Sequence, residues 1–193
     1  MELDEIVRFH GHLCPGLALG FRVANCAVKE LGLSRSADEE LVAVVENKSC
    51  AVDAIQMITG CTAGKGNLIF RDYGKQVYTF FRRGDGQAVR LAVRFIPPPE
   101  SPEETAAWAR YRAGDESSEV TSLVSRRKGE KTRAILAASD EELFTVSRPS
   151  EPPPSEAQIH PTVTCAVCGE MVMEPKTRRD PRGLVCIPCS QKS

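Results

Sequence analysis

The chain has 193 residues, of which 41% are hydrophobic and 26% are charged, as is typical of a folded globular protein. Its formal net charge of −1 excludes a general attraction to nucleic acid or to acidic membrane surfaces. The acidic start Met1-Glu2-Leu3-Asp4-Glu5 lacks the basic and apolar parts of a signal peptide, and no apolar run is long enough to span a membrane, so we expect a cytoplasmic protein.

The segment Phe9–Gly16 gathers two of the three histidines and a cysteine just ahead of an apolar-periodic run. That run predicts a helix over 15–31, with Pro15 in its first turn and Gly32 as its stop. Cys14 would then lie at the N-cap, where free N–H groups favour a thiolate and lower its pKa. A buried thiol in a turn that carries surface histidines is the alternative interpretation.

Two backbone conformations are open for the residues before this helix. If residues 10–14 are extended, His10, His12 and Cys14 all point to one side. If a preceding helix continues through them, His10 and Cys14 share a face and His12 does not.

A second polar cluster follows a strand predicted at 41–46. Ser49 is suited to cap a helix that runs from Cys50 to about Thr59 and ends at Gly60, which would lower the thiol pKa of Cys50. Asp53 lies three residues further on, on the same helix face. Each cysteine taken alone is more often a small core residue than a ligand, and we interpret Cys26 in that way.

Cys61 and Lys65 lie in the glycine-rich loop after this helix. The loop does not match a phosphate-binding P-loop. Three residues, and not the required four, separate Gly60 from Gly64-Lys65, and Gly66 stands where the P-loop needs Ser or Thr. Lys65 is either a positive charge beside an anionic substrate or thiolate, or a solvated loop lysine.

The rest of the first part predicts an α+β fold, with helices packed on a mainly antiparallel sheet. Strand-like runs at 68–73, 76–82 and 88–95 are separated by Gly74 and by Asp85-Gly86, which we expect at hairpin turns. Helices are predicted at 102–113 and 119–138, the second interrupted near Gly129, and a short strand at 143–146.

A proline-rich segment divides the chain. Residues 149–163 carry five prolines and few apolar side chains, which predicts a stiff linker between a core at 1–148 and a tail at 164–193. Four of the eight cysteines precede this linker and four follow it. In a reducing compartment they are expected to be ligands, redox groups or core residues and not disulfides.

The tail has the cysteine spacing of a four-cysteine zinc site, with Cys165 and Cys168 separated by seventeen residues from Cys186 and Cys189. Iron in a rubredoxin-like site would also suit this spacing, although zinc is commoner. About thirty residues bury too little surface to fold alone, so the metal would supply folding free energy. We expect 171–173 and 184–185 to pair as a hairpin and the metal to be structural.

The two core clusters together resemble the E-subunit family of formylmethanofuran dehydrogenase. The residues that carry the resemblance are Phe9-His10-Gly11-His12-x-Cys14-Pro15-Gly16 and Cys50-x-x-Asp53-Ala54-Ile55-Gln56-x-x-Thr59-Gly60-Cys61-Thr62-x-Gly64-Lys65-Gly66-Asn67-Leu68. The tail looks like a treble-clef or zinc-ribbon-like finger, with Cys186 and Cys189 at the first turn of a terminal helix. The resemblance implies a homodimer whose motif residues line a cavity. It makes candidate site residues of seven side chains: His10, His12, Cys14, Cys50, Asp53, Cys61 and Lys65.

Three functions compete. The first is a metal-binding accessory or redox protein of one-carbon or molybdenum/tungsten enzyme metabolism, partnering components of such enzymes, with structural zinc in the tail and a second metal in the core. That core metal would be held by His12, Cys14 and Cys61, with His10 or Cys50 as further ligands and Lys65 and Asp53 as charge partners. The second is a metal-free enzyme that uses Cys14 or Cys61 as nucleophile and a histidine as base. The third is a zinc-finger module binding protein or, less favoured by the charge, nucleic acid.

Overall fold

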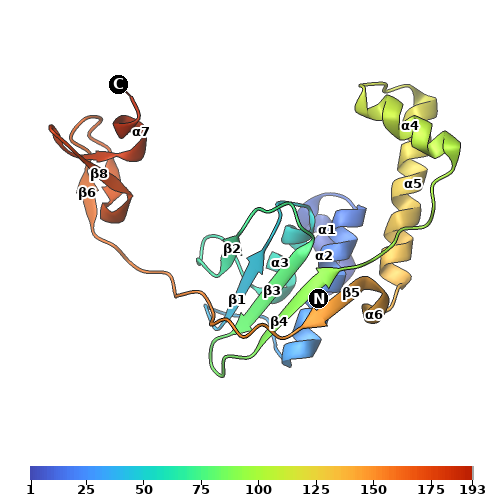
Figure 1. Ribbon diagram of the computed structural model, residues 1–193, viewed down its shortest axis with the longest axis horizontal. Helices are drawn as coiled ribbons and strands as arrows, with labels where there is room; N and C mark the ends of the chain where they lie inside the picture. The colour runs from blue at the N-terminus through green and yellow to red at the C-terminus, as the bar shows by residue number, and fades with distance from the viewer. Residues whose placement is uncertain (193) are drawn as a thin grey trace. The chain divides into compact units, whose positions relative to one another are not determined.

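A five-stranded sheet with the order β2-β1-β3-β4-β5 organises the first part of the chain (Figure 1). The computed structural model describes residues 1–192, which fall into two units, Met1–Glu156 and a second that begins at Ala157. The strands of the first unit are β1 (Leu41–Val45), β2 (Leu68–Phe70), β3 (Val77–Arg82), β4 (Ala88–Val93) and β5 (Phe144–Ser147). All pairings are antiparallel except that of β1 with β2, which confirms the predicted α+β fold with a mainly antiparallel sheet.

Three helices contribute to the main hydrophobic core on one face of this sheet: α1 (Leu3–His10), α2 (Pro15–Leu31) and α3 (Ala51–Thr59). Alternate strand residues such as Ala43, Tyr78 and Phe80 pack with them in that core, while Val42 and Val44 belong to a smaller apolar cluster. Each buried large apolar side chain stabilises the fold by roughly 1.5–3 kcal/mol. The predicted helix at 15–31 and the hairpin at Asp85-Gly86 are confirmed. The second predicted helix is also present, but it begins at Ala51 with Cys50, and not Ser49, as its N-cap.

Helices α2 and α3 approach each other closely at Gly20. A Cβ atom added to Gly20 would lie 2.2 Å from the carbonyl oxygen of Ala51, so only glycine fits. The N-terminal ends of the two helices are also close, since a Cβ on Gly16 would lie 3.0 Å from Cβ of Cys50. These two glycines therefore set the spacing of the residues that begin α2 and α3.

The expected hairpin at Gly74 is wrong. β2 pairs in parallel with β1, and β1 lies between β2 and β3. The connection from β1 through α3 to β2 is a crossover of the kind that parallel pairing requires. β2 and β3 are therefore consecutive in the sequence but are separated by β1 in the sheet.

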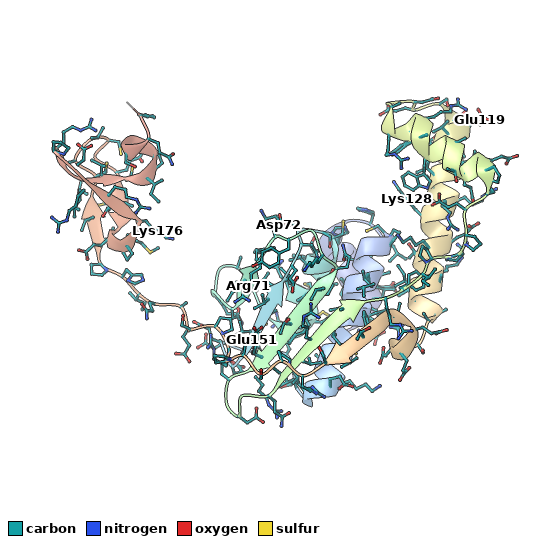
Figure 2. The ribbon with its side chains drawn as sticks, viewed as in Figure 1. Arg71, Asp72, Glu119, Lys128, Glu151 and Lys176 are labelled. Carbon is teal, nitrogen blue, oxygen red and sulfur yellow. The ribbon has the colours of Figure 1, made fainter. Side chains whose placement is uncertain are left out.

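Two further helices form a hairpin within the first unit, α4 (Pro102–Arg112) and α5 (Ser118–Ala137). They pack through a small apolar cluster of Ala107, Val120 and Val124. The predicted interruption near Gly129 is wrong, because α5 is continuous; a single glycine costs about 1 kcal/mol against alanine and does not by itself end a helix. Lys128 lies on the stretch of α5 that extends beyond the sheet (Figure 2).

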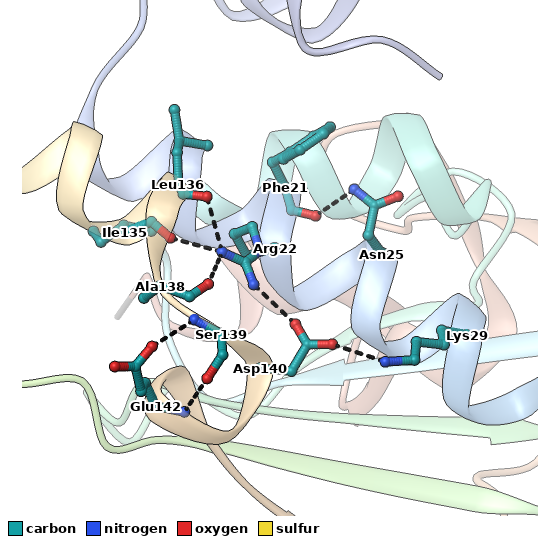
Figure 3. A network of polar contacts seen from close by, with 10 residues as sticks. All are labelled: Phe21, Arg22, Asn25, Lys29, Ile135, Leu136, Ala138, Ser139, Asp140 and Glu142. Atoms are coloured by element: carbon teal, nitrogen blue, oxygen red, sulfur yellow. Dashed lines mark hydrogen bonds and ion pairs between the residues drawn. The ribbon is translucent and has the colours of Figure 1, made fainter.

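Arg22 of α2 fixes the C-terminal end of α5 (Figure 3). Its Nη1 donates to the carbonyl oxygens of Ile135 at 2.9 Å, Leu136 at 3.1 Å and Ala138 at 2.5 Å. Its Nη2 lies 3.0 Å from Oδ1 of Asp140, which begins the short helix α6 (Asp140–Leu143). One guanidinium thus satisfies the last carbonyls of α5 and holds that helix against α2.

The second unit has two small sheets, followed by the short helix α7 (Ile187–Ser190). β6 (Thr162–Thr164) pairs with β7 (Met171–Met173), and β8 (Thr177–Asp180) pairs with β9 (Gly183–Cys186), with the 3-10 turn η1 (Glu174–Lys176) between them. The expected pairing of 171–173 with 184–185 is therefore wrong. Residues 171–173 belong to the β6–β7 hairpin and residues 184–185 to the β8–β9 hairpin. Cys165 and Cys168 lie between the strands of the first hairpin, and Cys186 ends the second.

The region predicted as a linker at 149–163 spans the boundary between the two units. Before this boundary, Nη1 of Arg83 donates to the carbonyl oxygen of Pro154 at 2.5 Å, and Nη2 of Arg148 lies 2.6 Å from Oε2 of Glu30. Arg148 and Pro154 thus contact the rest of the first unit. Among residues 1–192, no helix is both long enough and apolar enough to cross a membrane.

Candidate functional site

Three helix ends converge at the strongest candidate site of the first unit. His10 is the last residue of α1, Cys14 is the N-cap of α2 and Cys50 is the N-cap of α3. One ligand atom from each of these three side chains lies within 4.8 Å of the others. Ligand atoms around a tetrahedral zinc ion are about 3.5–3.8 Å apart, so this set is close to the spacing that a metal requires.

The backbone between His10 and Cys14 is neither of the two expected forms. α1 ends at His10, Gly11 takes a left-handed conformation with φ of 96°, and Cys14 is extended with φ of −139° and ψ of 166°. This turn brings Nε2 of His10 to 3.9 Å from Sγ of Cys14. Sγ of Cys14 also accepts the N–H of Leu17 at 3.4 Å, which confirms the predicted N-cap.

Asp53 orients the His10 ring. Nδ1 of His10 lies 2.7 Å from Oδ2 of Asp53, and the histidine side chain is only 10% exposed. A carboxylate on one ring nitrogen leaves the other nitrogen free to bind a metal, an arrangement common around metal-binding histidines. Nε2 is that free nitrogen, and it is the one that approaches Cys14.

The prediction that a helix start lowers the pKa of Cys50 is wrong. Burial raises this pKa, and the neighbouring thiol of Cys14 raises it further. Cys50 has helical dihedral angles and its thiol makes no capping hydrogen bond, so the free N–H groups of α3 do not stabilise a thiolate there. Two adjacent thiols in a half-buried place favour a cation that would neutralise both.

His12 lies at the edge of this cluster. Its ring centroid is 4.7 Å from that of His10 with a 36° angle between the planes, and the residue is exposed. His12 does not belong to the group of close ligand atoms. It lines a cavity beside that group instead.

The structure places Cys61 and Lys65 elsewhere. Cys61 is fully buried, its thiol donates to the carbonyl oxygen of Leu41 at 3.4 Å, and burial raises its pKa to about 11. Nζ of Lys65 donates to the carbonyl oxygens of Ala37 at 3.2 Å and Asp38 at 3.1 Å. The structure therefore does not bring these two residues to His10, Cys14 and Cys50.

A cavity of about 710 Å³ opens beside the thiols, lined on one side by His12, Cys14 and Cys50. The opposite wall comes from the α4–α5 hairpin, with Trp108, Lys128, Lys131 and Arg133 among its lining residues. Sequence reasoning missed this wall. No sequence motif marks it, because the hairpin and the thiols line one cavity only through tertiary packing.

The second unit brings Cys165, Cys168, Cys186 and Cys189 together, with one sulfur atom from each within 4.8 Å of the others. Backbone N–H groups, first that of Cys168 and then that of Cys186, lower the pKa of Cys165 to about 6. Contact with the thiol of Cys186 raises the pKa of Cys189, as expected where four thiols crowd together without a cation. Four sulfur donors suit zinc and leave no position for a substrate.

Known proteins resemble both units. The family described as "FmdE, Molybdenum formylmethanofuran dehydrogenase operon" matches residues 9–145, and the "Prokaryotic dksA/traR C4-type zinc finger" matches residues 161–193. An Archaeoglobus fulgidus protein named "Probable S-adenosyl-L-methionine-binding protein" is 31% identical over 188 residues, which cover 94% of this chain and 50% of that protein. The chain thus spans about half the length of this curated relative. The crystal structure of a "tungsten formylmethanofuran dehydrogenase subunit e (fmde)-like protein" from Syntrophus aciditrophicus has a TM-score of 0.64 at 24% identity, over 99% of this chain and 91% of that one, which shows a shared fold.

Proposed function

Since this chain belongs to the FmdE family and ends in a C4 zinc finger, we propose that it is a metal-binding accessory or redox protein with a second metal in its core. The observation that carries the proposal is the group of His10, Cys14 and Cys50, whose ligand atoms lie within 4.8 Å of one another. The link to one-carbon and molybdenum or tungsten enzymes rests on the family name. The S-adenosyl-L-methionine in the relative's name is not carried over, because half of that relative lies outside the match.

The chemistry of the three donors fits a soft or borderline divalent metal such as zinc. Thiolate and imidazole are the ligands that zinc and similar transition metals prefer, whereas magnesium and calcium take oxygen ligands. Asp53 would hold the His10 ring in place and raise its basicity. When bound, a metal with three protein ligands keeps a position for water or substrate and acts as a Lewis acid.

Other residues around that open position would have separate roles. Cys14 and Cys50 both line the cavity, so a molecule bound in it would lie against both residues. His12 lines the same cavity beside the His10 ring and is exposed, so it would act as the acid or base toward a bound molecule. Lys65 is not part of this arrangement, because its amine caps the carbonyl oxygens of residues 36–38.

Metal content of the purified full chain tests this proposal. We expect about two equivalents per chain, of which Cys14→Ser/Cys50→Ser removes the core metal and Cys165→Ser removes the finger metal. Cys26→Ser, at a buried thiol in α2, is the matched control and should keep both. One equivalent in the unaltered chain, abolished by Cys165→Ser, would refute the core metal.

The same geometry favours one second candidate, a thiol enzyme without core metal. Cys14, His10 and Asp53 stand in the order of nucleophile, base and orienting carboxylate, with 3.9 Å and 2.7 Å between successive partners. This candidate predicts that Cys14 in metal-stripped protein reacts with iodoacetamide faster than a free thiol near neutral pH, and that His10→Gln abolishes the excess rate. A rate no faster than that of a free thiol would exclude it.

We also propose that the chain acts in the cytoplasm as a homodimer that serves one-carbon or molybdenum/tungsten enzymes. Support for association comes from apolar side chains exposed beside the site, Phe9 at 56% and Leu13 at 45%. Light scattering of the purified chain tests the dimer, and Phe9→Ser/Leu13→Ser should shift it toward the monomer. A monomeric unaltered chain at working concentration would contradict this part.

A further inference from the structure

The cavity beside the core thiols has an unbalanced charge. Four of its lining residues are cationic, and the single acidic one is Glu100; the cations are Arg127, Lys128, Lys131 and Arg133. The whole chain, by contrast, has a formal net charge of −1. The positive charge is therefore a local property of this cavity and not a reflection of overall composition.

Two of the four cations already have partners in the fold. Arg127 is buried; its Nε lies 3.7 Å from Oε1 of Glu100, and its guanidinium donates to the carbonyl oxygen of Pro98. Nζ of Lys128 lies 5.7 Å from the ring centroid of Trp108 and 5.2 Å from that of Tyr111, which are cation–π distances. These two side chains hold the wall of the cavity together.

The other two cations are free to bind a ligand. Lys131 and Arg133 are exposed, line the cavity, and form no ion pair with any of residues 1–192. Unpaired cations that line a cavity attract an anion, and a guanidinium can bind phosphate or carboxylate oxygens through two parallel N–H donors.

Gly129 contributes room on the same wall. It lines the cavity in the interior of α5, where glycine costs about 1 kcal/mol of helix stability against alanine. A Cβ atom at this position would lie 3.5 Å from Nη1 of Arg133 and would narrow the space beside that guanidinium. The missing side chain thus leaves the cation accessible from the cavity.

We propose that this cavity binds a small organic molecule that carries a phosphate or carboxylate group. Lys131 and Arg133 hold the anionic group, Trp108 offers an apolar surface to the remainder, and the molecule's far end reaches Cys14 and Cys50. The anionic class of the ligand follows from the cations alone, whereas a reaction at the thiols rests on the proposed function. A small molecule is favoured over nucleic acid because Arg126 and Arg127 of the basic run are engaged by Glu104 and Glu100.

Trp108 supplies the measurement, because it is the chain's single tryptophan and lines the cavity. We expect phenyl phosphate and benzoate to change its fluorescence saturably with a Kd on the order of 1 mM or tighter at low salt, and neutral benzyl alcohol to have no such effect. Titration calorimetry provides a second readout. Absence of saturable binding of either anion would overturn the proposal.

A pair of charge-matched variants locates the site. Lys131→Gln/Arg133→Gln should weaken anion binding at least about tenfold, since it removes both charge-assisted contacts. Arg71→Gln/Lys75→Gln removes the same charge from exposed positions outside the cavity and should change the affinity less than about twofold. Equal losses in both variants, or tighter binding of a short RNA than of phenyl phosphate through Lys131 and Arg133, would overturn the proposal.

The variant Cys14→Ser/Cys50→Ser distinguishes the core-metal proposal from the anion-site proposal. This variant should lose the core metal and still bind benzoate in a manner that depends on Lys131 and Arg133. Metal loss with retained anion binding supports both proposals. If the unaltered chain has no core metal but binds benzoate, the proposed function fails and the anion site stands. If it has the core metal but does not bind benzoate, only the anion site is refuted.

Discussion

Nδ1 of His10, the last residue of α1, lies 2.7 Å from Oδ2 of Asp53 in the first turn of α3. The carboxylate fixes the ring so that Nε2 faces Sγ of Cys14. We expect Asp53→Asn to weaken core-metal affinity about 10- to 100-fold, because an amide orients the imidazole less strongly and leaves it less basic. Competition with a metal-binding dye measures this affinity.

Two controls accompany Asp53→Asn. Asp72→Asn removes an exposed carboxylate whose partner is Lys48 at 3.5 Å, and it should leave both metals unchanged. The finger metal should also be retained in Asp53→Asn, because its four ligands lie in the second unit. An unchanged core affinity in Asp53→Asn would mean that this carboxylate does not support a metal ligand.

Gly20 controls how closely α2 and α3 pack. In Gly20→Ala the new Cβ would lie 2.2 Å from the carbonyl oxygen of Ala51, so the helices must separate. We expect a loss of about 1–3 kcal/mol in the free energy of unfolding, together with weaker core-metal binding, since Cys14 and Cys50 move apart. Gly64→Ala is the matched control, because a Cβ there meets no atom within 4 Å and φ is not positive. Urea unfolding measures the stability of both variants, and equal free energies of unfolding for Gly20→Ala and Gly64→Ala would contradict the prediction.

The sequence predicted the helices better than the sheet order. Pro15, Gly32 and Gly60 are local signals, and the helices between them begin and end where these residues predict. The neighbours of β1 depend instead on the crossover through α3, which a run of apolar residues at 68–70 does not reveal. Local chemistry therefore predicts where elements end, while long-range packing decides which strands pair.

The candidate site divides in the same way. Cys14 at a helix start and Asp53 three residues after Cys50 follow from local spacing, and the structure brings both to His10. Cys61 lies next to the same motif in the sequence, yet its buried thiol donates to the carbonyl oxygen of Leu41 in β1 and does not join the cluster. Trp108 and Arg133 approach the thiols only through tertiary packing of the α4–α5 hairpin, so no motif marks them.

Arg22 and Lys29 form a natural pair for testing how α5 is held, since both contact Asp140 (Figure 3). Arg22 also donates to three carbonyl oxygens at the end of α5 and its side chain is 16% exposed, whereas that of Lys29 is 71% exposed. Arg22→Met should cost about 2–4 kcal/mol of unfolding free energy, because it removes the side-chain donor to those carbonyls and leaves Asp140 with the exposed Lys29 alone.

Lys29→Met should cost far less than Arg22→Met, because an exposed ion pair contributes little to stability. Thermal unfolding of the two variants measures the difference. In Arg22→Met, faster amide hydrogen exchange in residues 130–138 would identify α5 as the loosened element. Similar stability losses in the two variants would show that the carbonyl contacts of Arg22 contribute nothing beyond its ion pair.

Cys61 gives the fold a defined dependence on alkaline pH. Its buried thiol donates to the carbonyl oxygen of Leu41, and burial raises its pKa from 9.0 to about 11. Because the folded pKa lies above the unfolded one, the neutral thiol's contribution is fully present below pH 9 and is lost as pH rises through about 11. The stability difference between the unaltered chain and Cys61→Ala, from urea unfolding, should therefore shrink over this range. Iodoacetamide at pH 8 should modify Cys61 only at the rate of global unfolding; rapid modification of the folded protein, or a stability difference constant with pH, would contradict its place in the core.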